Sequence, residues 1–296
     1  MGMSSLREIY APENAGPSQV LSIEFWPPKT EVGERNLFTE LDRLLKLNPA
    51  FCSMTYGAGG STRDKTVDLV SRIERERGID MMCHLTVVDQ SKAEVRSVLD
   101  HLREAGVHNI IALGGDPKPG ADWASHPDGF GHADELVTEA LGATYGDWFS
   151  VAVAGFPEVH PRAESRESDV RYLKAKVDAG ACVVITQLFL DNADYYRYVE
   201  DVRRAGIEVP IVPGMMPFRS APQVRRFTAM CGARIPAKLD RLLASVEDDD
   251  AAAVRLGTDY ATEQCAELVE FGVPGFHFYS LNKADAVMEI HSRLGW

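Results

Sequence analysis

The sequence lacks the cysteine spacing that holds zinc or a disulfide framework. Its five cysteines are far apart, and no two form a C-x-x-C pair; they are Cys52, Cys83, Cys182, Cys231 and Cys265. Most lie within apolar runs, where a buried thiol is the usual case. We therefore expect no metal site and no disulfides, and a reducing cytoplasm as the location of the protein.

The sequence also lacks long apolar runs and an excess of positive charge. No apolar stretch approaches the ~20 residues that a membrane-spanning helix needs. Residues 1–20 contain no export signal, and Leu6 stands where the N-myristoylation pattern requires Ser or Thr. The net charge of −13 disfavours nucleic acid or an anionic membrane as a partner. Small anionic ligands need only a local positive patch, so the charge does not exclude them.

What the chain does contain is eight short apolar runs, rich in β-branched and aromatic residues. They begin at Ser22, Phe51, Met81, Ile110, Phe149, Cys182, Ile211 and Gly275. Runs that are apolar on both sides are typical of parallel strands covered on both faces. The runs therefore predict eight parallel strands.

Helix-like segments separate these runs. One follows Ser61 as N-cap, and the next begins with the capping box of Ser91 and Glu94 and ends at Gly106. Two further segments end at Gly180 and Gly206. The longest gap, before the eighth strand, predicts extra helices.

Eight strands that alternate with helices favour an α/β fold, a (β/α)8 TIM barrel with extra helices before the eighth strand. The competing architecture is a doubly wound open sheet, which usually carries nucleotide-binding glycines after its first strand. Here the first run ends in "EFWPPK", without a glycine. We expect a flexible N-terminal segment over residues 1–20 and a single catalytic barrel domain over residues 21–296.

Polar side chains recur at the C-terminal ends of the predicted strands, where barrels of this class carry their catalytic groups. In chain order these positions hold Glu24, Thr55, His84, Asp116, Phe156 (with Glu158 and His160 nearby), Gln187, Met215 and Tyr279. A ring of polar and ionisable residues in this place indicates a binding or catalytic site.

Glu24 is the sharpest candidate, because it lies between Ile23 and Phe25 inside a strand. Desolvation there would raise its pKa and keep the carboxyl protonated, as a general acid requires. Alternatively, the side chain points outward and pairs with a helix Lys or Arg, and the position alone does not decide. Structural roles also stay open for other candidates: a core histidine for His84, an Asp-Pro turn for Asp116, a buried amide for Gln187, and core aromatics for Phe227 and Tyr279.

Nine motifs, in a fixed order from about Ser22 to the C-terminus, carry a family resemblance. They are "EFWPPK", "TYGAGGSTRDKT", "HLTVVD", "LGGDP", "FPEVHP", "KVDAGACVVITQLFLD", "IVPGMMP", "RIPA" and "FHFYSLN". The set resembles the methylenetetrahydrofolate reductase family in its bacterial form, which has only the catalytic domain. At this length we expect no C-terminal regulatory domain.

The resemblance implies an oxidoreductase of one-carbon metabolism and methionine biosynthesis. It implies FAD at the mouth of the barrel, reduced by NADH or NADPH, which then leaves. The folate takes the same place and receives the hydride, so that 5,10-methylenetetrahydrofolate becomes 5-methyltetrahydrofolate. NADH is the donor we expect. Members of the family are often dimers or tetramers, so a homo-oligomer fits the resemblance.

Site residues follow motif by motif. The resemblance makes Glu24 the general acid that protonates the folate nitrogen and opens the methylene bridge, and Asp116 the acid that contacts the pterin and tunes the flavin. It assigns folate contacts to Gln187, Gln223, Phe227, Tyr279 and Lys283. It assigns FAD contacts to Thr55, His84, Gly115, Asp116, Ala133, Phe156, His160, Asp169 and Lys176.

Three positions depart from the family pattern. Gly114 replaces an arginine associated with the flavin pyrophosphate, Phe156 replaces a tyrosine, and Lys283 replaces an arginine for the folate tail. One lost charge-assisted contact costs roughly 1.5–3 kcal/mol, or about ten- to hundredfold in affinity. We expect either weaker FAD binding or a substitute charge from Arg63, Lys118 or Lys174.

Two other functions stay open. The departures at Gly114 and Phe156 motivate direct hydride transfer from NAD(P)H to folate, without a tightly bound flavin. A non-catalytic folate- or flavin-binding barrel is the third reading, which the retention of Glu24 and Asp116 disfavours.

Overall fold

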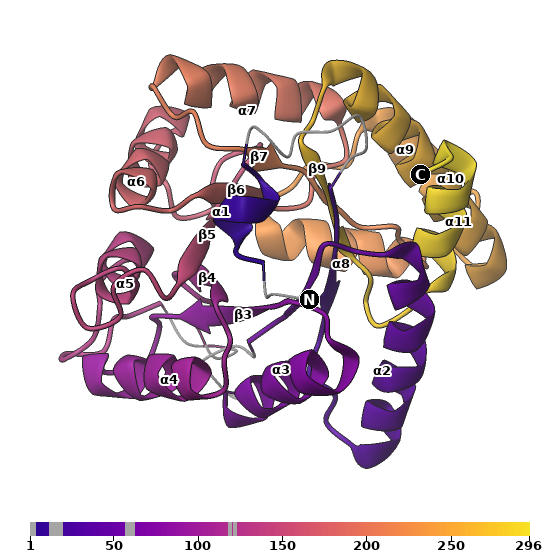
Figure 1. Ribbon diagram of the computed structural model, residues 1–296. Helices are drawn as coiled ribbons and strands as arrows, with labels where there is room; N and C mark the ends of the chain where they lie inside the picture. Colours follow the sequence, from indigo (N-terminus) through magenta and orange to yellow (C-terminus); the bar gives the residue numbers. More distant parts are fainter. Residues whose placement is uncertain (1–3, 12–19, 57–62, 118–119, 121–122) are drawn as a thin grey trace.

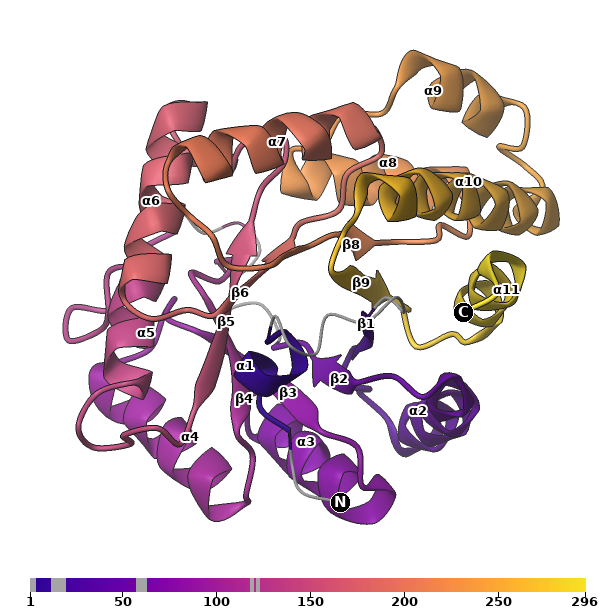
Figure 2. The same ribbon diagram turned by 45° about the horizontal axis from the view of Figure 1, so that its top comes forward.

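The computed structural model describes residues 4–11, 20–56, 63–117, 120 and 123–296. Its strands form one parallel sheet that curls into a barrel, with helices around its outer side (Figures 1 and 2). The strands are β1 (Val20–Phe25), β2 (Phe51–Met54), β3 (Met81–Thr86), β4 (Asn109–Leu113), β5 (Ser150–Gly155), β6 (Val183–Thr186), β7 (Ile211–Val212), β8 (Gly214–Met215) and β9 (Gly275–Tyr279). Their order in the sheet is β7-β6-β5-β4-β3-β2-β1-β9-β8.

The seventh predicted strand is divided in two by Pro213. β7 pairs with β6, and β8 pairs with β9. Proline has no N–H for a ladder, but the Pro213 carbonyl accepts a hydrogen bond from the backbone N–H of His277 at 3.0 Å. Because β7 and β8 belong to one run of chain, this change of partner closes the sheet. The (β/α)8 barrel is therefore confirmed, and the open sheet is excluded.

The helices follow the predicted alternation. They are α2 (Glu31–Leu44) with the 3-10 turn η2 (Leu45–Leu47), α3 (Arg63–Arg77), α4 (Lys92–Glu104), α5 (Ala133–Ala140), α6 (Arg166–Asp178), α7 (Asn192–Arg204), α8 (Ala221–Cys231), α9 (Ala237–Ala244), α10 (Asp250–Phe271) and α11 (Asp285–Leu294). The capping box of Ser91 and Glu94 is present, and Gly106, Gly180 and Gly206 have the positive φ that ends a helix. The predicted extra helices before the last strand are also present, as α8, α9 and α10. Ser61 lies outside the described residues.

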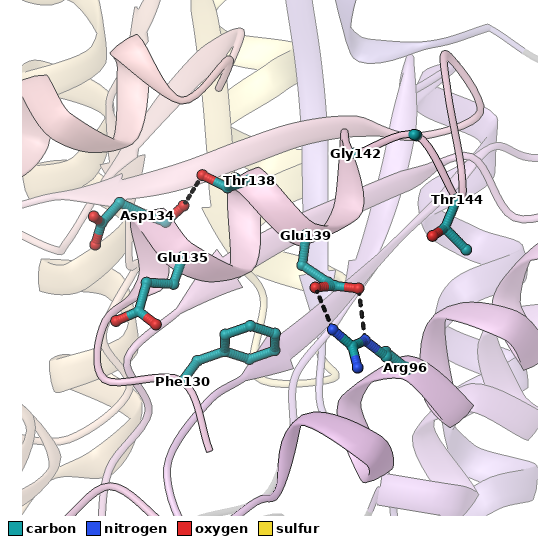
Figure 3. Close-up of a pocket in the computed structure, with 9 residues that line it drawn as sticks. Arg96, Phe130, Asp134, Glu135, Thr138, Glu139, Gly142 and Thr144 are labelled. Carbon is teal, nitrogen blue, oxygen red and sulfur yellow. Dashed lines mark hydrogen bonds and ion pairs between the residues drawn. The ribbon is translucent and has the colours of Figure 1, made fainter. Parts of the chain in front are cut away.

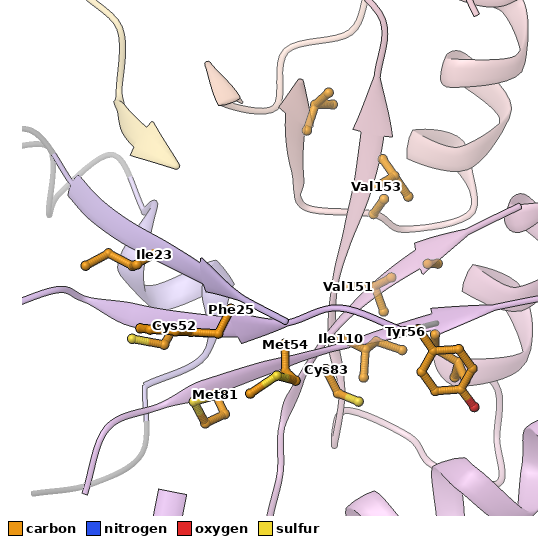
Figure 4. Close-up of a cluster of buried hydrophobic side chains, with 14 of the residues drawn as sticks. Ile23, Phe25, Cys52, Met54, Tyr56, Met81, Cys83, Ile110, Val151 and Val153 are labelled. Atoms are coloured by element: carbon orange, nitrogen blue, oxygen red, sulfur yellow. The ribbon is translucent and has the colours of Figure 1, made fainter. Parts of the chain in front are cut away.

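Side-chain direction along β1 is set by the strand's two-residue period. Ile23 and Phe25 are fully buried in the apolar layer between sheet and helices, together with Cys52, Met54 and Met81 (Figure 4). Ser22 and Glu24 alternate with them and therefore point into the barrel. The same alternation makes Glu24 an interior residue, which excludes the outward orientation.

The N-terminal residues differ from the flexible segment expected over residues 1–20. Helix α1 (Leu6–Ile9) has a capping box of Ser5 and Glu8, and it lies across the N-terminal end of the barrel (Figure 1). The Leu6 N–H donates to Oδ1 of Asn109 at 2.9 Å, and the Leu6 side chain is fully buried. Asn109 begins β4, so this short helix is part of the packed barrel. Residues 12–19 lie outside the described part of the chain.

All five cysteines are free thiols, and three are buried. None of the helices in the described residues is long and apolar enough to cross a membrane. Within the same residues, no cluster of three or more His, Cys, Asp or Glu side chains could hold a metal ion.

Candidate active site at the mouth of the barrel

Glu24 meets two histidines inside the barrel. Its side chain is 7% exposed, and Oε2 lies 3.2 Å from Nε2 of His84 on β3 and 3.6 Å from Nε2 of His277 on β9. Three strands thus bring together one acid and two bases from distant parts of the sequence. His84 was predicted as a site residue, whereas His277 was not.

Two serines fix the orientation of His277. Nδ1 lies 2.8 Å from Oγ of Ser22, and that hydroxyl donates to the carbonyl of Phe276 at 3.1 Å. When the Ser22 proton is used in this way, its oxygen accepts from Nδ1–H of His277. Nε2 lies 3.3 Å from Oγ of Ser53 and faces Glu24. It can donate to the carboxylate only when the ring carries both protons.

The electrostatics of Glu24 differ from the expected protonated carboxyl. Burial raises the pKa of Glu24, but hydrogen bonds and charge interactions with His277 and His84 outweigh burial and bring the pKa to about 2. The expected rise in the pKa of Glu24 is therefore not found: the two histidines shift the pKa downward, which favours the ionised carboxylate. The cause lies on β3 and β9, which residues next to Glu24 in the sequence do not reveal.

The loop after β4 comes close to β3 at Gly115. Its φ is +81°, and a Cβ there would lie 2.6 Å from Cγ1 of Val88 and 2.8 Å from Cβ of Thr86. The Gly115 carbonyl accepts a hydrogen bond from Nε1–H of Trp123 at 3.1 Å. Only glycine fits this position. Asp116 follows it and is exposed, so its carboxylate is free to meet a ligand at the mouth.

Basic and aromatic side chains gather after β5. The Phe156 and His160 rings pack edge to face with centroids 4.4 Å apart. The backbone N–H of His160 donates to Oδ2 of Asp169 at 3.0 Å. Lys176 donates from Nζ to the Ala154 carbonyl at 2.7 Å and makes no ion pair within the described residues. Burial lowers the pKa of Lys176 to about 8, against the opposing charges of Asp169 and Asp134. Because one of the three N–H donors of the ammonium is used by Ala154, the others can bind a further acceptor.

The residues assigned to folate are spread over several loops. Tyr279 donates from its hydroxyl to the Thr186 carbonyl at 2.5 Å, Oε1 of Gln187 accepts from the N–H of Leu188 at 2.7 Å, and Oε1 of Gln223 accepts from the N–H of Arg219 at 2.9 Å. Nζ of Lys283 lies 3.6 Å from Oε1 of Glu40 on α2, so this lysine forms an ion pair within the chain.

Trp26 is a residue of this mouth that the sequence reasoning missed. Its ring packs edge to face on Phe227 with centroids 5.8 Å apart, and the side chain is 39% exposed. Its backbone N–H and C=O both bond to the Asn282 side chain, at 2.8 and 2.9 Å. An exposed Trp directly after a buried strand was the available signal.

Two of the residues assigned to FAD, Thr55 and Ala133, show only backbone or neighbouring contacts at the mouth. Thr55 follows β2, and its N–H donates to the Phe25 carbonyl at 2.9 Å. Ala133 is the first residue of α5, next to His132, whose ring stacks toward Trp123 with centroids 6.5 Å apart.

A pocket of about 450 Å³ lies elsewhere, between α4 and α5 (Figure 3). Arg96 and Phe130 line it, and the Arg96 guanidinium is engaged by both carboxylate oxygens of Glu139, at 2.7 and 3.0 Å. The pocket contains none of the predicted site residues, so the barrel mouth remains the candidate site.

Comparison with known proteins gives one consistent family. The family model for methylenetetrahydrofolate reductase matches residues 11–295. Methylenetetrahydrofolate reductase (NADH) 1 of Arabidopsis thaliana is 40% identical over 284 residues, which cover 93% of this chain and 48% of that protein. The 5,10-methylenetetrahydrofolate reductase of Escherichia coli K12 is 38% identical over 275 residues, which cover 93% of this chain and 90% of that protein.

The chain thus spans about half the length of the plant relative and most of the bacterial one. Among solved structures, a Clostridium thermocellum protein that binds two copies of 5-methyl-5,6,7,8-tetrahydrofolic acid matches with a TM-score of 0.64 at 16% identity. The match covers 98% of this chain and 97% of that protein, and at this identity it supports the fold alone.

Proposed function

The chain belongs to the methylenetetrahydrofolate reductase family, and we propose that it reduces 5,10-methylenetetrahydrofolate to 5-methyltetrahydrofolate with hydride from NADH or NADPH relayed through FAD. The observation that carries the proposal is Glu24, a buried carboxylate held between His84 and His277 beneath the mouth of the barrel. The names of the plant relatives favour NADH as the donor.

The residues at the ends of β4 and β5 fit a flavin dinucleotide. Gly115 leaves no room for a side chain, so the loop after β4 packs closely on β3 and places Asp116 at the mouth. Phe156 offers an apolar face, and Lys176 has donors left for a phosphate or ribityl oxygen. When bound, FAD supplies a carrier that takes hydride from the nicotinamide and passes it to the folate.

Glu24 would deliver the proton that opens the methylene bridge. A folate that covers the mouth removes water from the carboxylate, and loss of water favours its neutral form. A proton carried on Nε2 of His84 or His277 would lie 3.2 or 3.6 Å from Oε2 of Glu24. Its transfer to Oε2 would convert the ionised acid into a donor that faces the folate nitrogen.

The other side chains of the mouth would bind and orient. Phe227 and Trp26 offer an aromatic pair for the pterin or benzoyl ring, and Gln187, Gln223 and Asp116 offer polar contacts. Lys283 would leave its ion pair with Glu40 and pair instead with the carboxylates of the folate tail.

The absorption spectrum of the purified protein tests the cofactor. Flavin bands that are released on denaturation, together with NAD(P)H oxidation that depends on methylenetetrahydrofolate or menadione, are the expected result. Full activity in a colourless preparation, unchanged by added FAD, would instead support direct hydride transfer to folate. Folate binding with no reductase activity under any condition would support the non-catalytic barrel.

A further inference from the structure

The guanidinium of Arg162 lies next to Gly114, the position at which family members commonly have an arginine. Its Nη2 atom lies 3.2 Å from the position where a Cβ of residue 114 would be. Its Cζ lies 4.3 Å from the ring centroid of Trp123, and that indole donates to the carbonyl of Gly115. A guanidinium that lies over the ring of an anchored tryptophan is held more firmly than the guanidinium of an arginine that extends freely from a loop.

Apart from its stack on Trp123 and the nearby charge of Asp116, the Arg162 guanidinium is not engaged by the described part of the chain. Its guanidinium makes no hydrogen bond or ion pair with any residue that the structure describes, although its backbone N–H donates to Nδ1 of His160 at 3.0 Å. Partial burial lowers the pKa of Arg162, and the Asp116 charge offsets this only in part. The five N–H donors of a permanently charged group are thus left for a ligand.

Two cations converge on the same ring. Burial, together with the positive charges of Arg162 and Lys176, lowers the pKa of His160 to about 4. The two fixed positive charges are therefore close enough to repel a third. Such a patch in a chain of net charge −13 matches an anion with more than one negative charge.

Of the three cations named from the sequence, Lys174 is the one whose side chain lies within the described residues. Lys174 is engaged with Asp178 on the outer side of α6. Lys118 and the side chain of Arg63 lie outside the described residues. Arg162 was not among the candidates, because a loop arginine in "HPRAES" has no local signal that sets it apart.

We propose that Arg162 binds the diphosphate of the dinucleotide cofactor, with its guanidinium occupying the space that opens because residue 114 is glycine. Lys176 adds the second charge from α6. This inference rests on the flavin of the proposed function and names the residue of this chain that compensates for the missing arginine.

The test is FAD binding to apoprotein, measured by calorimetry or flavin fluorescence, which needs no turnover. We expect Arg162→Gln to weaken FAD binding about tenfold or more, and to reduce its dependence on salt. Arg103→Gln is the matched control. Arg103 also stacks on a tryptophan, Trp148, but it lies in the last turn of α4, at the opposite end of the barrel.

A charge swap makes the test independent of folding defects. Gly114→Arg added to Arg162→Gln should restore affinity, whereas Gly114→Arg alone should not raise it, because Arg162 already occupies that space. If the parent binds FAD and Arg162→Gln binds it equally well, this inference is wrong and the proposed function stands. If the parent binds methylenetetrahydrofolate and NADH but no FAD, the flavin assignment and this inference both fail.

Discussion

Nε2 of His277 lies 3.6 Å from Oε2 of Glu24, one layer deeper in the barrel than the acid itself. The register of β1 and β9 pairs Ser22 with His277 and Glu24 with Tyr279, so the histidine reaches the carboxylate from below. His277 therefore does not approach Glu24 from the mouth of the barrel. In the proposed mechanism, a proton from His277 would reach Glu24 from below and leave it toward the mouth.

Replacement of Glu24 separates the two half-reactions. We expect Glu24→Gln to slow folate reduction by about 10²–10⁴-fold, because the amide cannot donate an acidic proton. Flavin reduction by NADH needs no such proton and should stay near the parent rate. Rapid-mixing measurements of each half-reaction check this. Glu158→Gln is the control, since Glu158 binds the backbone N–H of Arg234 at 2.9 Å, and folate reduction at the parent rate in Glu24→Gln would remove the acid assignment.

The lowered pKa of Glu24 also predicts how stability depends on pH. The folded-state pKa is about 2, below the ordinary value of 4.5. The ionised pair therefore contributes stability above pH 4.5, and that contribution is lost as pH falls toward 2. Denaturant unfolding at several pH values should show a steeper loss in this window for the parent than for Glu24→Gln. Parallel curves for the two proteins would contradict the lowered pKa.

His277→Asn should shift the pH profile of folate reduction rather than only its height. The substitution removes a group that lowers the pKa of Glu24, while His84 still faces the carboxylate and Ser22, Ser53 and Tyr279 remain nearby. Glu24 should hold its proton to higher pH, so the basic limb of the pH–rate profile should move to higher pH. A lower rate with an unmoved profile would indicate that His277 only supports the barrel interior.

Sequence alone was sufficient for those parts of the fold that local pattern determines. Both-side apolar runs predicted the strands, and Ser91 with Glu94 predicted the start of α4, because a capping box is complete within four residues. The ring of polar strand ends predicted the mouth of the barrel. Each of these signals is carried by neighbours in the chain.

What sequence could not supply are contacts between distant strands. The ionised state of Glu24 depends on His277, more than 250 positions away, and the change of strand partner at Pro213 depends on β6 and β9. The helix over Leu6–Ile9 is ordered by Asn109 and Ser150 rather than by its own length. Arg162 becomes a site residue only because Trp123 and Gly114 are folded beside it.

Lys283 should act in folate binding and not in flavin reduction. Its ammonium is exposed and shared with Glu40, so it is free to exchange that acid for a folate carboxylate. We expect Lys283→Ala to raise KM for methylenetetrahydrofolate up to about tenfold with little change in kcat, as loss of uniform binding does. Lys174→Ala, which removes a half-buried lysine paired with Asp178, is the control. An equal rise of KM in both variants would show a non-specific effect of charge.

Gly115 and Gly120 form a matched pair that separates backbone strain from crowding. Both have positive φ, +81° and +82°, but a Cβ at Gly115 would meet Val88 and Thr86 at 2.6 and 2.8 Å. A Cβ at Gly120 would meet no atom of the described residues within 4 Å. Alanine at either position carries a left-handed strain of about 1–2 kcal/mol. Crowding adds about 1–3 kcal/mol at Gly115 alone.

Gly115→Ala should therefore be the less stable of the two variants in denaturant unfolding. It should also weaken FAD binding, because Thr86 ends the strand that carries His84 and Gly115 anchors Trp123 beneath Arg162. Gly120→Ala should keep the parent affinity for FAD. Equal stabilities and equal affinities in the two variants would mean that the close approach of the β4 loop to β3 contributes nothing to the site.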